Sequence, residues 1–580
     1  MGKGQCTGNA SPTNSINFRT LCLQDGPLGV RSTTGITAFP PGIQAASTWD
    51  RSLMYARGHG VGEETKAMGI NVILGGRNWE GFSSDSYLDG VAMEQTIGGI
   101  QDERGREMTN PVIDDRTMLG LYLWPFAEAV RVAVLCSYNK IELGFNGYVV
   151  TDWNAGHSNI GVANAGLDIG LPGKNPFRGS ALQSAIGSGV SSSRLNDIQN
   201  SGYPSIAVTA KGGGSGRNVQ TTNHTATTRA VARDGIVLLK NTGNLLPLRK
   251  PKSIAIIGSG AVVNLKGIHS CGWDSGTVTL PNLSAPADAI TTRAKADGTT
   301  ITTSASGTAS QGSTAAQNAD VAIVFITADS GEGYTVVEKN TSDCSDLEAW
   351  HSGAELVKAV AGVNKNTIVA VNTVGPILLE AFADLLTERL GTVLYWIVSP
   401  SGMLPYTIAK LASDYGNSIR SGSDSFAEEV FIDYRPFGKA NIAPRSEFGF
   451  GLSYATFNDT NISIAGLPTS GAASGTIVPG GSSSLFDTAA TATAITTNSG
   501  SATGAKVAQL YTGLPSTAPS SPVRQIRGGS ATVTFRLRKK DLSYWDTSAK
   551  AWTVPKGSIT VSMGASSRDI RLTELSSFLE

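Results

Sequence analysis

Hydrophobic residues in the first 400 positions follow two alternating patterns: short apolar runs, and longer stretches with an apolar residue every three to four positions. The short runs predict strands and the longer stretches predict amphipathic helices. Strands are expected at 69–75, 132–139, 148–150, 253–257, 321–326, 367–373 and 392–398. Helices are expected at 49–68, 114–131, 163–168, 181–199, 227–239, 345–362 and 378–390. Strands that alternate with helices favour parallel sheets, so we expect an α/β multidomain fold.

The last third of the chain has a different pattern. A passage rich in Gly, Ser, Ala and Thr runs from about 466 to 504. Apolar residues then occupy every second position from 533 to 537, and again from 559 to 563. Alternation with a period of two predicts strands with one buried face. The expected structure is an antiparallel β-sandwich of immunoglobulin-like size.

The boundaries between these regions are set by length and by one flexible passage. A chain of 580 residues is too long for a single hydrophobic core. The alternation of strands and helices breaks at 201–228, where the sequence KGGGSGR is typical of a tether. We therefore predict an α/β domain at 1–200, a linker at 201–228, a second α/β domain at 229–415, and a C-terminal segment with the β-sandwich at 416–580.

The charge balance excludes some classes of partner. Lysine plus arginine equals aspartate plus glutamate, 46 of each, so nothing attracts the chain to nucleic acid or to an anionic membrane. No apolar run approaches the eighteen residues of a membrane span. The start, MGKGQCTGNAS, lacks an apolar core, so no signal peptide is expected in this chain.

The cysteines point to a disulfide rather than to a metal. None of the five forms a CxxC pair or lies near histidines at metal-binding spacing. Cys6 and Cys22 could bridge a modest loop in an oxidising compartment, or they could be two unconnected thiols. Acceptor sequences for N-glycosylation occur at Asn9, Asn223, Asn282, Asn340, Asn458 and Asn461.

Two carboxylates stand where chemistry is expected. Asp152 ends the apolar strand of GYVVTDWNAGH, and Glu332 lies between two glycines just after the predicted strand at 321–326. Strand ends face the substrate in α/β barrels, although a lone strand-end aspartate is also a common helix cap. Glycoside hydrolysis uses such a pair, one carboxylate to attack the anomeric carbon and the other to protonate the leaving oxygen.

Eight motifs, in the same order along the chain, resemble those of fungal β-glucosidases of glycoside hydrolase family 3. They are QDGPLGVR, GGRNWEGFSSD, VLCSYN, VVTDW, ADSGEGY, FGFGLSY, VAQLYTGLPS and RKKDLSYWD. The resemblance implies a (β/α) barrel-like domain, an α/β sandwich domain and a fibronectin type III-like domain, which correspond to the three regions above. It also implies secretion.

The resemblance assigns roles to six residues. It implies Asp152 as the nucleophile and Glu332, from the second domain, as the general acid and base. Asp25 would bind sugar hydroxyls, Arg77 and Tyr138 would hold the ring and the nucleophile, and Trp153 would line the pocket. No metal or organic cofactor is implied, because both steps use carboxylates. The expected substrate is a β-glucoside or a cello-oligosaccharide. Whether the chain forms a homodimer is left open.

One departure from the family pattern leaves alternatives open. The family has a Lys-His pair that binds sugar hydroxyls, but this chain runs from GIQDERGREM directly into TNPVIDDRT without that segment, as in a shortened or redesigned member. Three hypotheses therefore remain: a retaining β-glucosidase, a weak or inactive carbohydrate-binding pseudoenzyme with the same fold, and a chain that folds incompletely.

Overall fold

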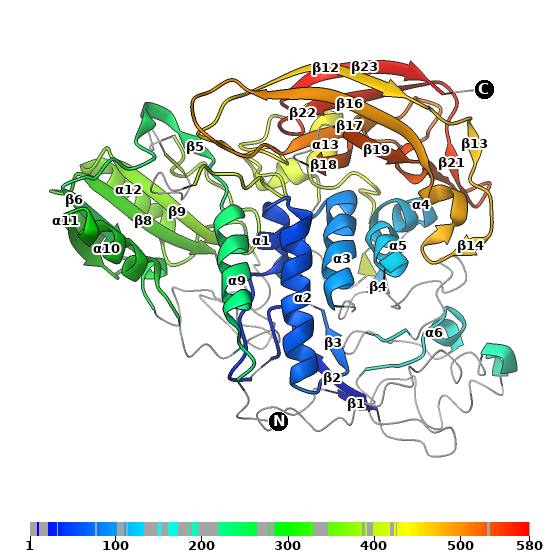
Figure 1. The fold of residues 1–580 in the computed structure, drawn as a ribbon, viewed down its shortest axis with the longest axis horizontal. Helices are drawn as coiled ribbons and strands as arrows, with labels where there is room; N and C mark the ends of the chain where they lie inside the picture. The colour runs from blue at the N-terminus through cyan, green and yellow to red at the C-terminus, as the bar shows by residue number, and fades with distance from the viewer. Residues whose placement is uncertain are drawn as a thin grey trace.

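The computed structural model describes most of the chain. The described residues are 8–10, 21–31, 33–75, 78–100, 110–111, 114–132, 149–151, 160–171, 184, 188–194, 218–263, 278, 283–328, 346–384, 389–390, 398–417, 423–424, 426–530 and 534–578. They form three parts: N-terminal strands and helices, a central sheet covered by helices, and a C-terminal β-sandwich that lies across the ends of the N-terminal helices (Figure 1). No helix in this part of the chain has the length and apolar character needed to cross a membrane.

The N-terminal part contains a small sheet of three strands, β1 (Gly8–Ala10), β2 (Leu21–Asp25) and β3 (Val72–Leu74). β2 is parallel to β3 and antiparallel to β1. A parallel bridge between Val150 and Ile169 adds further extended chain. The strand predicted at 69–75 is confirmed in its central residues.

Four helices stand side by side beneath the sandwich: α2 (Arg51–Ala67), α3 (Ser86–Ile100), α5 (Leu123–Val132) and α9 (Thr222–Asp234) (Figure 1). The shorter α1 (Gly42–Ser47) precedes them in the chain. α2 and α3 approach closely at Gly58, where a Cβ atom would lie 2.3 Å from the carbonyl oxygen of Thr96. Only glycine fits there, because any side chain would push the two backbones apart.

Three predicted helices of this part differ in their bounds. The stretch at 114–131 is helical but is divided into α4 (Asp115–Thr117), a π-turn (Met118–Tyr122) and α5. The helix predicted at 163–168 is instead α6 (Ile160–Asn164), which ends before Gly166, a residue with φ of 111°. α9 begins at Thr222, capped by the Thr221 side chain, so it includes the end of the predicted linker range.

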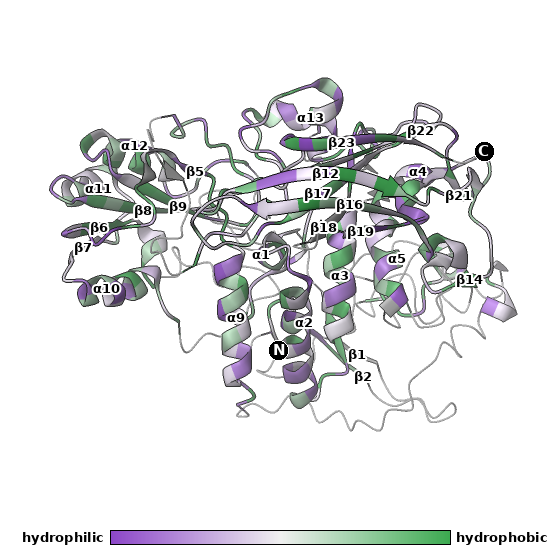
Figure 2. Ribbon diagram, turned by 45° about the horizontal axis from the view of Figure 1, so that its top comes forward, coloured by the Kyte–Doolittle hydropathy of each residue, from purple (hydrophilic) through white to green (hydrophobic). Residues whose placement is uncertain are grey.

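The central part is a six-stranded sheet in the order β5-β10-β9-β8-β6-β7, parallel except for β5. Its strands are β5 (Lys240–Asn241), β6 (Ser253–Ile257), β7 (Thr300–Ser304), β8 (Val321–Ala328), β9 (Thr367–Thr373) and β10 (Arg389–Leu390). The helices α11 (Ala309–Ala316) and α12 (Gly353–Val363) cover one face, and α10 (Pro286–Ala296) covers the other. All of β8 is buried, and most of its residues are apolar (Figure 2).

Two helix predictions in the central part need correction. Residues 380–384 form turns rather than a helix, and Arg389–Leu390 is strand β10. Leu379 and Phe382 have helical spacing because a single turn buries both against the sheet. The helix predicted at 345–362 starts only at Gly353, because His351 and Ser352 have φ of 56° and interrupt it.

The C-terminal part is the predicted sandwich. One sheet contains β12 (Phe457–Ala465), β16 (Thr488–Asn498) and β19 (Thr534–Arg538). The other contains β18 (Gln525–Ser530), β17 (Ala508–Gly513), β22 (Ser558–Gly564) and β23 (Ile570–Ser577). Phe535 and Leu537 of the first sheet share a core with Val561 of the second, as the alternation predicts.

Short elements complete the described structure. β20 (Tyr544–Asp546), β21 (Ala551–Val554) and β13 (Gly471–Ala472) form a small sheet, and β14 (Ile477–Val478) pairs with β15 (Gly481–Ser482). β4 (Asn110–Pro111) pairs with β11 (Ser423–Asp424), and α13 (Tyr434–Ala440) precedes the sandwich.

One hydrophobic core connects the N-terminal helices with the sandwich. It contains Trp124 of α5, Met403 and Phe448 from beyond the central sheet, and Tyr511 and Ile526 of the sandwich. Each of these side chains is at most 6% exposed. The N-terminal helices and the sandwich therefore share buried surface.

Candidate functional site

Asp25 is the one predicted site residue whose surroundings the structure describes. It is the last residue of β2, opposite Leu74 at the end of β3. Its Oδ2 accepts a hydrogen bond from Nη1 of Arg31 at 2.7 Å, and its carbonyl oxygen accepts one from the Arg31 backbone N–H at 2.9 Å. The Asp25 side chain is 17% exposed, so the carboxylate is oriented by Arg31 and still reaches the surface at the strand end.

The strand that leads to Asp152 is anchored by a buried ion pair. The backbone N–H of Val149 donates to Oδ2 of Asp168 at 2.6 Å, and the other carboxylate oxygen of Asp168 accepts from Nη2 of Arg194 at 3.0 Å. Arg194 also donates to the carbonyl oxygens of Ala163 and Leu167. Neither partner was identified from the sequence, because nothing local to either residue signals a contact across 26 positions.

Three strand ends of the N-terminal part come together. Leu23 of β2, Val72 of β3 and Val150 share one hydrophobic cluster with Leu171. The chain continues from these strands to three predicted site residues: Asp25 ends β2, Arg77 follows β3 by three positions, and Asp152 follows Thr151. The described residues that end in or precede these three predicted site residues in the chain are thus neighbours in the fold.

The described residues before and after the segment that contains Glu332 both contact β8 of the central sheet. It leaves β8 at Ala328. After it, the backbone N–H of Trp350 donates to the carbonyl oxygen of Thr327 at 2.9 Å. A loop fixed at the carboxyl end of a central parallel strand is a common place for catalytic groups.

Five predicted site residues lie outside the described residues: Arg77, Tyr138, Asp152, Trp153 and Glu332. Their roles stay predictions. Cys22 is disulfide-bonded and fully buried. Cys6 lies outside the described residues, so its pairing with Cys22 also stays a prediction. Within the described residues, no group of His, Cys, Asp or Glu could hold a metal ion.

A cavity of about 920 Å³ lies between the start of α2, the end of α9 and the loop at 501–507. None of the predicted site residues is among its described lining. Several of its charged side chains have partners within the chain: Asp50 caps α2, Arg233 pairs with Asp234 at 2.5 Å, and Lys506 pairs with Asp459. We therefore do not assign the reaction to this cavity.

Comparison with known families gives two matches. The model of the glycosyl hydrolase family 3 C-terminal domain matches residues 236–454. The model of the fibronectin type III-like domain matches residues 506–567.

Curated relatives match along almost the whole chain. "Beta-glucosidase cel3A" of Pyricularia oryzae is 45% identical over 676 aligned positions, which cover 99% of this chain and 92% of the relative. "Probable beta-glucosidase L" of Aspergillus terreus is 44% identical, with 98% and 92% covered.

Solved structures agree in fold. The beta-D-glucoside glucohydrolase of Trichoderma reesei superposes with a TM-score of 0.89 at 46% identity, covering 99% of this chain and 94% of that one. The beta-glucosidase D2-BGL of Chaetomella raphigera gives 0.90 at 45% identity, covering 99% and 95%.

Proposed function

The chain belongs to glycoside hydrolase family 3, and on that premise we propose that it is a retaining β-glucosidase that releases glucose from the non-reducing ends of β-glucosides. One structural observation supports the proposal most directly: the three strands that lead to Asp25, Arg77 and Asp152 pack together in one cluster. β-Glucosidases that match 99% of the chain add independent support.

The proposed reaction has two displacements. In the first, the Asp152 carboxylate attacks the anomeric carbon, the bond from that carbon to the leaving oxygen breaks, and Glu332 gives its proton to that oxygen. In the second, Glu332 takes a proton from water, and the water oxygen displaces Asp152 from the anomeric carbon. Asp152 and Glu332 return to their starting states, so the cycle consumes only the glucoside and water.

Asp25 would bind the sugar in both steps. A carboxylate can accept hydrogen bonds from two hydroxyl groups, and such charge-assisted bonds are stronger than neutral ones. The bond from Nη1 of Arg31 to Oδ2 orients the Asp25 carboxylate at the end of β2.

The alternative is a pseudoenzyme that binds glucosides without turnover. Its support is the absence of the Lys-His segment between GIQDERGREM and TNPVIDDRT. The alignment with cel3A also extends over 676 positions, more than the 580 residues of this chain, so that relative has residues without a counterpart here. Losing hydrogen bonds that strengthen in the transition state would cost several kcal/mol.

The deciding experiment is the initial rate of aryl β-glucoside hydrolysis by the full chain and by Asp152→Asn. Asp384→Asn, a change at a residue with a 79% exposed side chain, is the matched control. The proposal expects a loss of about a thousandfold or more in Asp152→Asn and none in the control. If all three proteins melt cooperatively and hydrolyse equally slowly while binding glucose, the pseudoenzyme is the correct assignment.

We also propose that the chain is exported. The disulfide at Cys22 is typical of an oxidising compartment, and three of the glycosylation acceptors, Asn223, Asn458 and Asn461, are exposed. Enzymatic deglycosylation of the protein purified from its own source should lower its mass. An unchanged mass and a free Cys22 thiol would contradict export.

A further inference from the structure

The loop that follows Arg77 is held rigidly. It begins with a turn at Asn78–Glu80 and ends at Asp85, and the side chains of Trp79, Glu80 and Phe82 in it are buried. Asp85 then starts α3, because its Oδ1 accepts from the backbone N–H groups of Tyr87 and Leu88 at 2.8 and 3.1 Å.

Two serines of this loop bind a segment more than 300 positions away in the chain. Oγ of Ser83 donates to the carbonyl oxygen of Pro405 at 2.7 Å. Oγ of Ser84 donates to Oδ2 of Asp433, and Asp433 also accepts from the backbone N–H and the hydroxyl of Thr407. One carboxylate therefore joins the loop at 78–85 to the segment at 405–407.

Asp433, which accepts these hydrogen bonds, has an unfavourable backbone conformation. Its φ is 50° and its ψ is −125°, outside the regions that side chains other than glycine prefer. Such a conformation costs on the order of 1–3 kcal/mol and persists only when neighbouring contacts impose it. Strain of this kind is concentrated at sites where geometry matters for function.

The segment that Asp433 and Ser83 bind belongs to the same hydrophobic cluster as the end of β8. Leu404 and Ile408 flank the bound residues, and each is 4% exposed. Both belong to the same hydrophobic cluster as Ile326 and Ala328, the last residues of β8. Glu332 lies four positions beyond Ala328 in the chain. A continuous line of contacts thus runs from the loop after Arg77 to the strand before Glu332.

We propose that Ser84 and Asp433 are positioning residues that fix the carboxyl end of β8 against the N-terminal strand ends, so that the acid/base carried by the central sheet reaches the leaving oxygen. The inference rests on the proposed function. It assigns to these two side chains no contact with substrate.

The test uses two glucosides that differ in their need for an acid. Cellobiose has a poor leaving group and requires protonation, whereas 2,4-dinitrophenyl β-glucoside leaves without it. Ser84→Ala removes the bond to Asp433 but keeps the bonds from Thr407. Its matched control is Thr496→Val, which removes a similar bond from a hydroxyl to a carboxylate, 2.8 Å from Oγ1 to Oδ1 of Asp459, between β16 and β12 of the sandwich.

We expect Ser84→Ala to lower kcat for cellobiose by about tenfold or more and kcat/KM for the dinitrophenyl glucoside by less than about twofold. Thr496→Val should change neither. Equal losses on both substrates, or no loss on either, would overturn the positioning role while leaving the β-glucosidase assignment intact. A wild-type chain that hydrolyses neither substrate would overturn both.

Discussion

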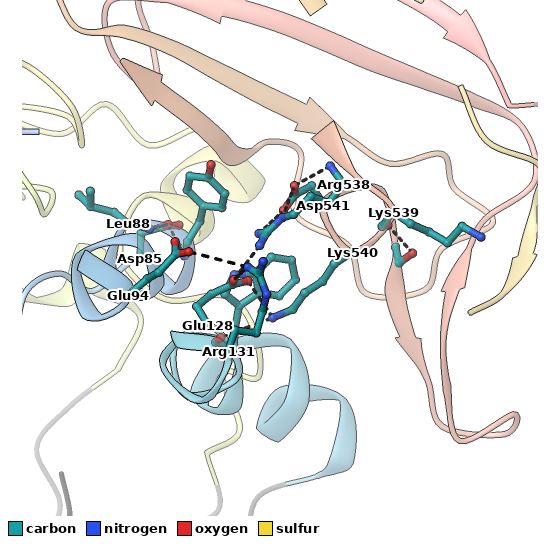
Figure 3. A network of polar contacts seen from close by, with 12 residues as sticks. Asp85, Leu88, Glu94, Glu128, Arg131, Arg538, Lys539, Lys540 and Asp541 are labelled. Carbon is teal, nitrogen blue, oxygen red and sulfur yellow. Dashed lines mark hydrogen bonds and ion pairs between the residues drawn. The ribbon is translucent and has the colours of Figure 1, made fainter. Parts of the chain in front are cut away.

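Glu128 and Lys540, 412 positions apart in the chain, form a salt bridge of 3.1 Å in which neither side chain is more than 2% exposed. Glu128 also accepts from Arg538 at 2.6 Å and from Arg131 at 3.0 Å (Figure 3). Burial alone would raise the pKa of Glu128, but Lys540, Arg538 and Arg131 together hold it far below its usual range. This network attaches the sandwich to α5.

Replacing Glu128 with Gln should strongly destabilise the protein. The change leaves the buried Lys540 without its ion-pair partner, whereas Arg538 keeps Asp541 and Arg131 keeps Glu94. Breaking a buried ion pair typically costs about 3–5 kcal/mol. Urea unfolding measures the loss. Glu380→Gln is the control, because the Glu380 to Arg445 pair lies nearer the surface and should contribute about 1 kcal/mol or less. Similar losses in the two variants would show that burial does not determine the strength of these pairs.

The contacts of His224 should make the stability of the protein depend on pH. Its Nδ1 lies 2.7 Å from Oε1 of Glu64 and its Nε2 lies 3.0 Å from Oε2 of Glu63, which joins α9 to α2. Burial lowers the pKa of His224, but the hydrogen bonds to both carboxylates outweigh it, so the net pKa is raised. The folded pKa is above the unfolded value of about 6.5, so this stabilisation is complete below about pH 6.5 and is lost as pH rises through the folded pKa.

Unfolding free energies measured between pH 6 and pH 9 should therefore fall with pH in the wild type and less steeply in His224→Gln. His59→Gln is the control, because the His59 side chain is 53% exposed. An identical slope in wild type and His224→Gln would assign the pH dependence to other groups.

Gly258 should not tolerate alanine. It follows β6 with φ of 106°, and a Cβ atom would lie 2.2 Å from the carbonyl oxygen of Phe325 in β8. Strain and steric overlap together should cost about 3 kcal/mol or more in urea unfolding. Gly298 also has a positive φ, 77°, but has open space around its Cα, so Gly298→Ala should cost only about 1 kcal/mol. Equal costs would show that the contact with β8 relaxes easily.

Asp25→Asn should reduce kcat/KM for aryl glucosides by about a hundredfold, because the neutral amide loses charge-assisted bonds to the sugar. Arg31→Gln keeps the Asp25 carboxylate but removes its 2.7 Å partner, so a loss of about tenfold or less is expected. A larger effect from Arg31→Gln than from Asp25→Asn would make Arg31, rather than Asp25, the group that contacts substrate.

Peptide mapping without reduction should find Cys6 joined to Cys22. A disulfide that closes a loop of this size stabilises the folded protein by about 3 kcal/mol. The free energy of unfolding of Cys6→Ser should therefore be lower by about that amount. Cys22 joined to any other cysteine would contradict the pairing.

The sequence predicts those elements whose signal is local. β6 and β9 are found at the predicted residues, because each is an apolar run bounded by turn-forming residues. Asp25 was assigned from the family resemblance, and the structure places it at the end of β2. The prediction at 378–390 is wrong because burial of one turn imitates helical spacing there.

Other parts of the site could not be predicted in this way. Asp85 pairs with Arg435 at 2.8 Å, and Asp168 pairs with Arg194, yet each pair forms only after distant segments have packed. Charged residues are common on surfaces, so nothing in their neighbours marks them as buried. Such partners follow from the fold and not from the sequence near them.

The shared core also bears on how the chain is made. Trp124 packs in that core with Ile526, which the ribosome adds roughly 400 residues later. At a synthesis rate of about 5–20 residues per second, the apolar faces of the N-terminal helices stay exposed for on the order of 20–80 s before the sandwich residues that bury them are made. The nascent chain is therefore exposed to aggregation for most of its synthesis, and chaperones that bind apolar helices would act before the sandwich emerges.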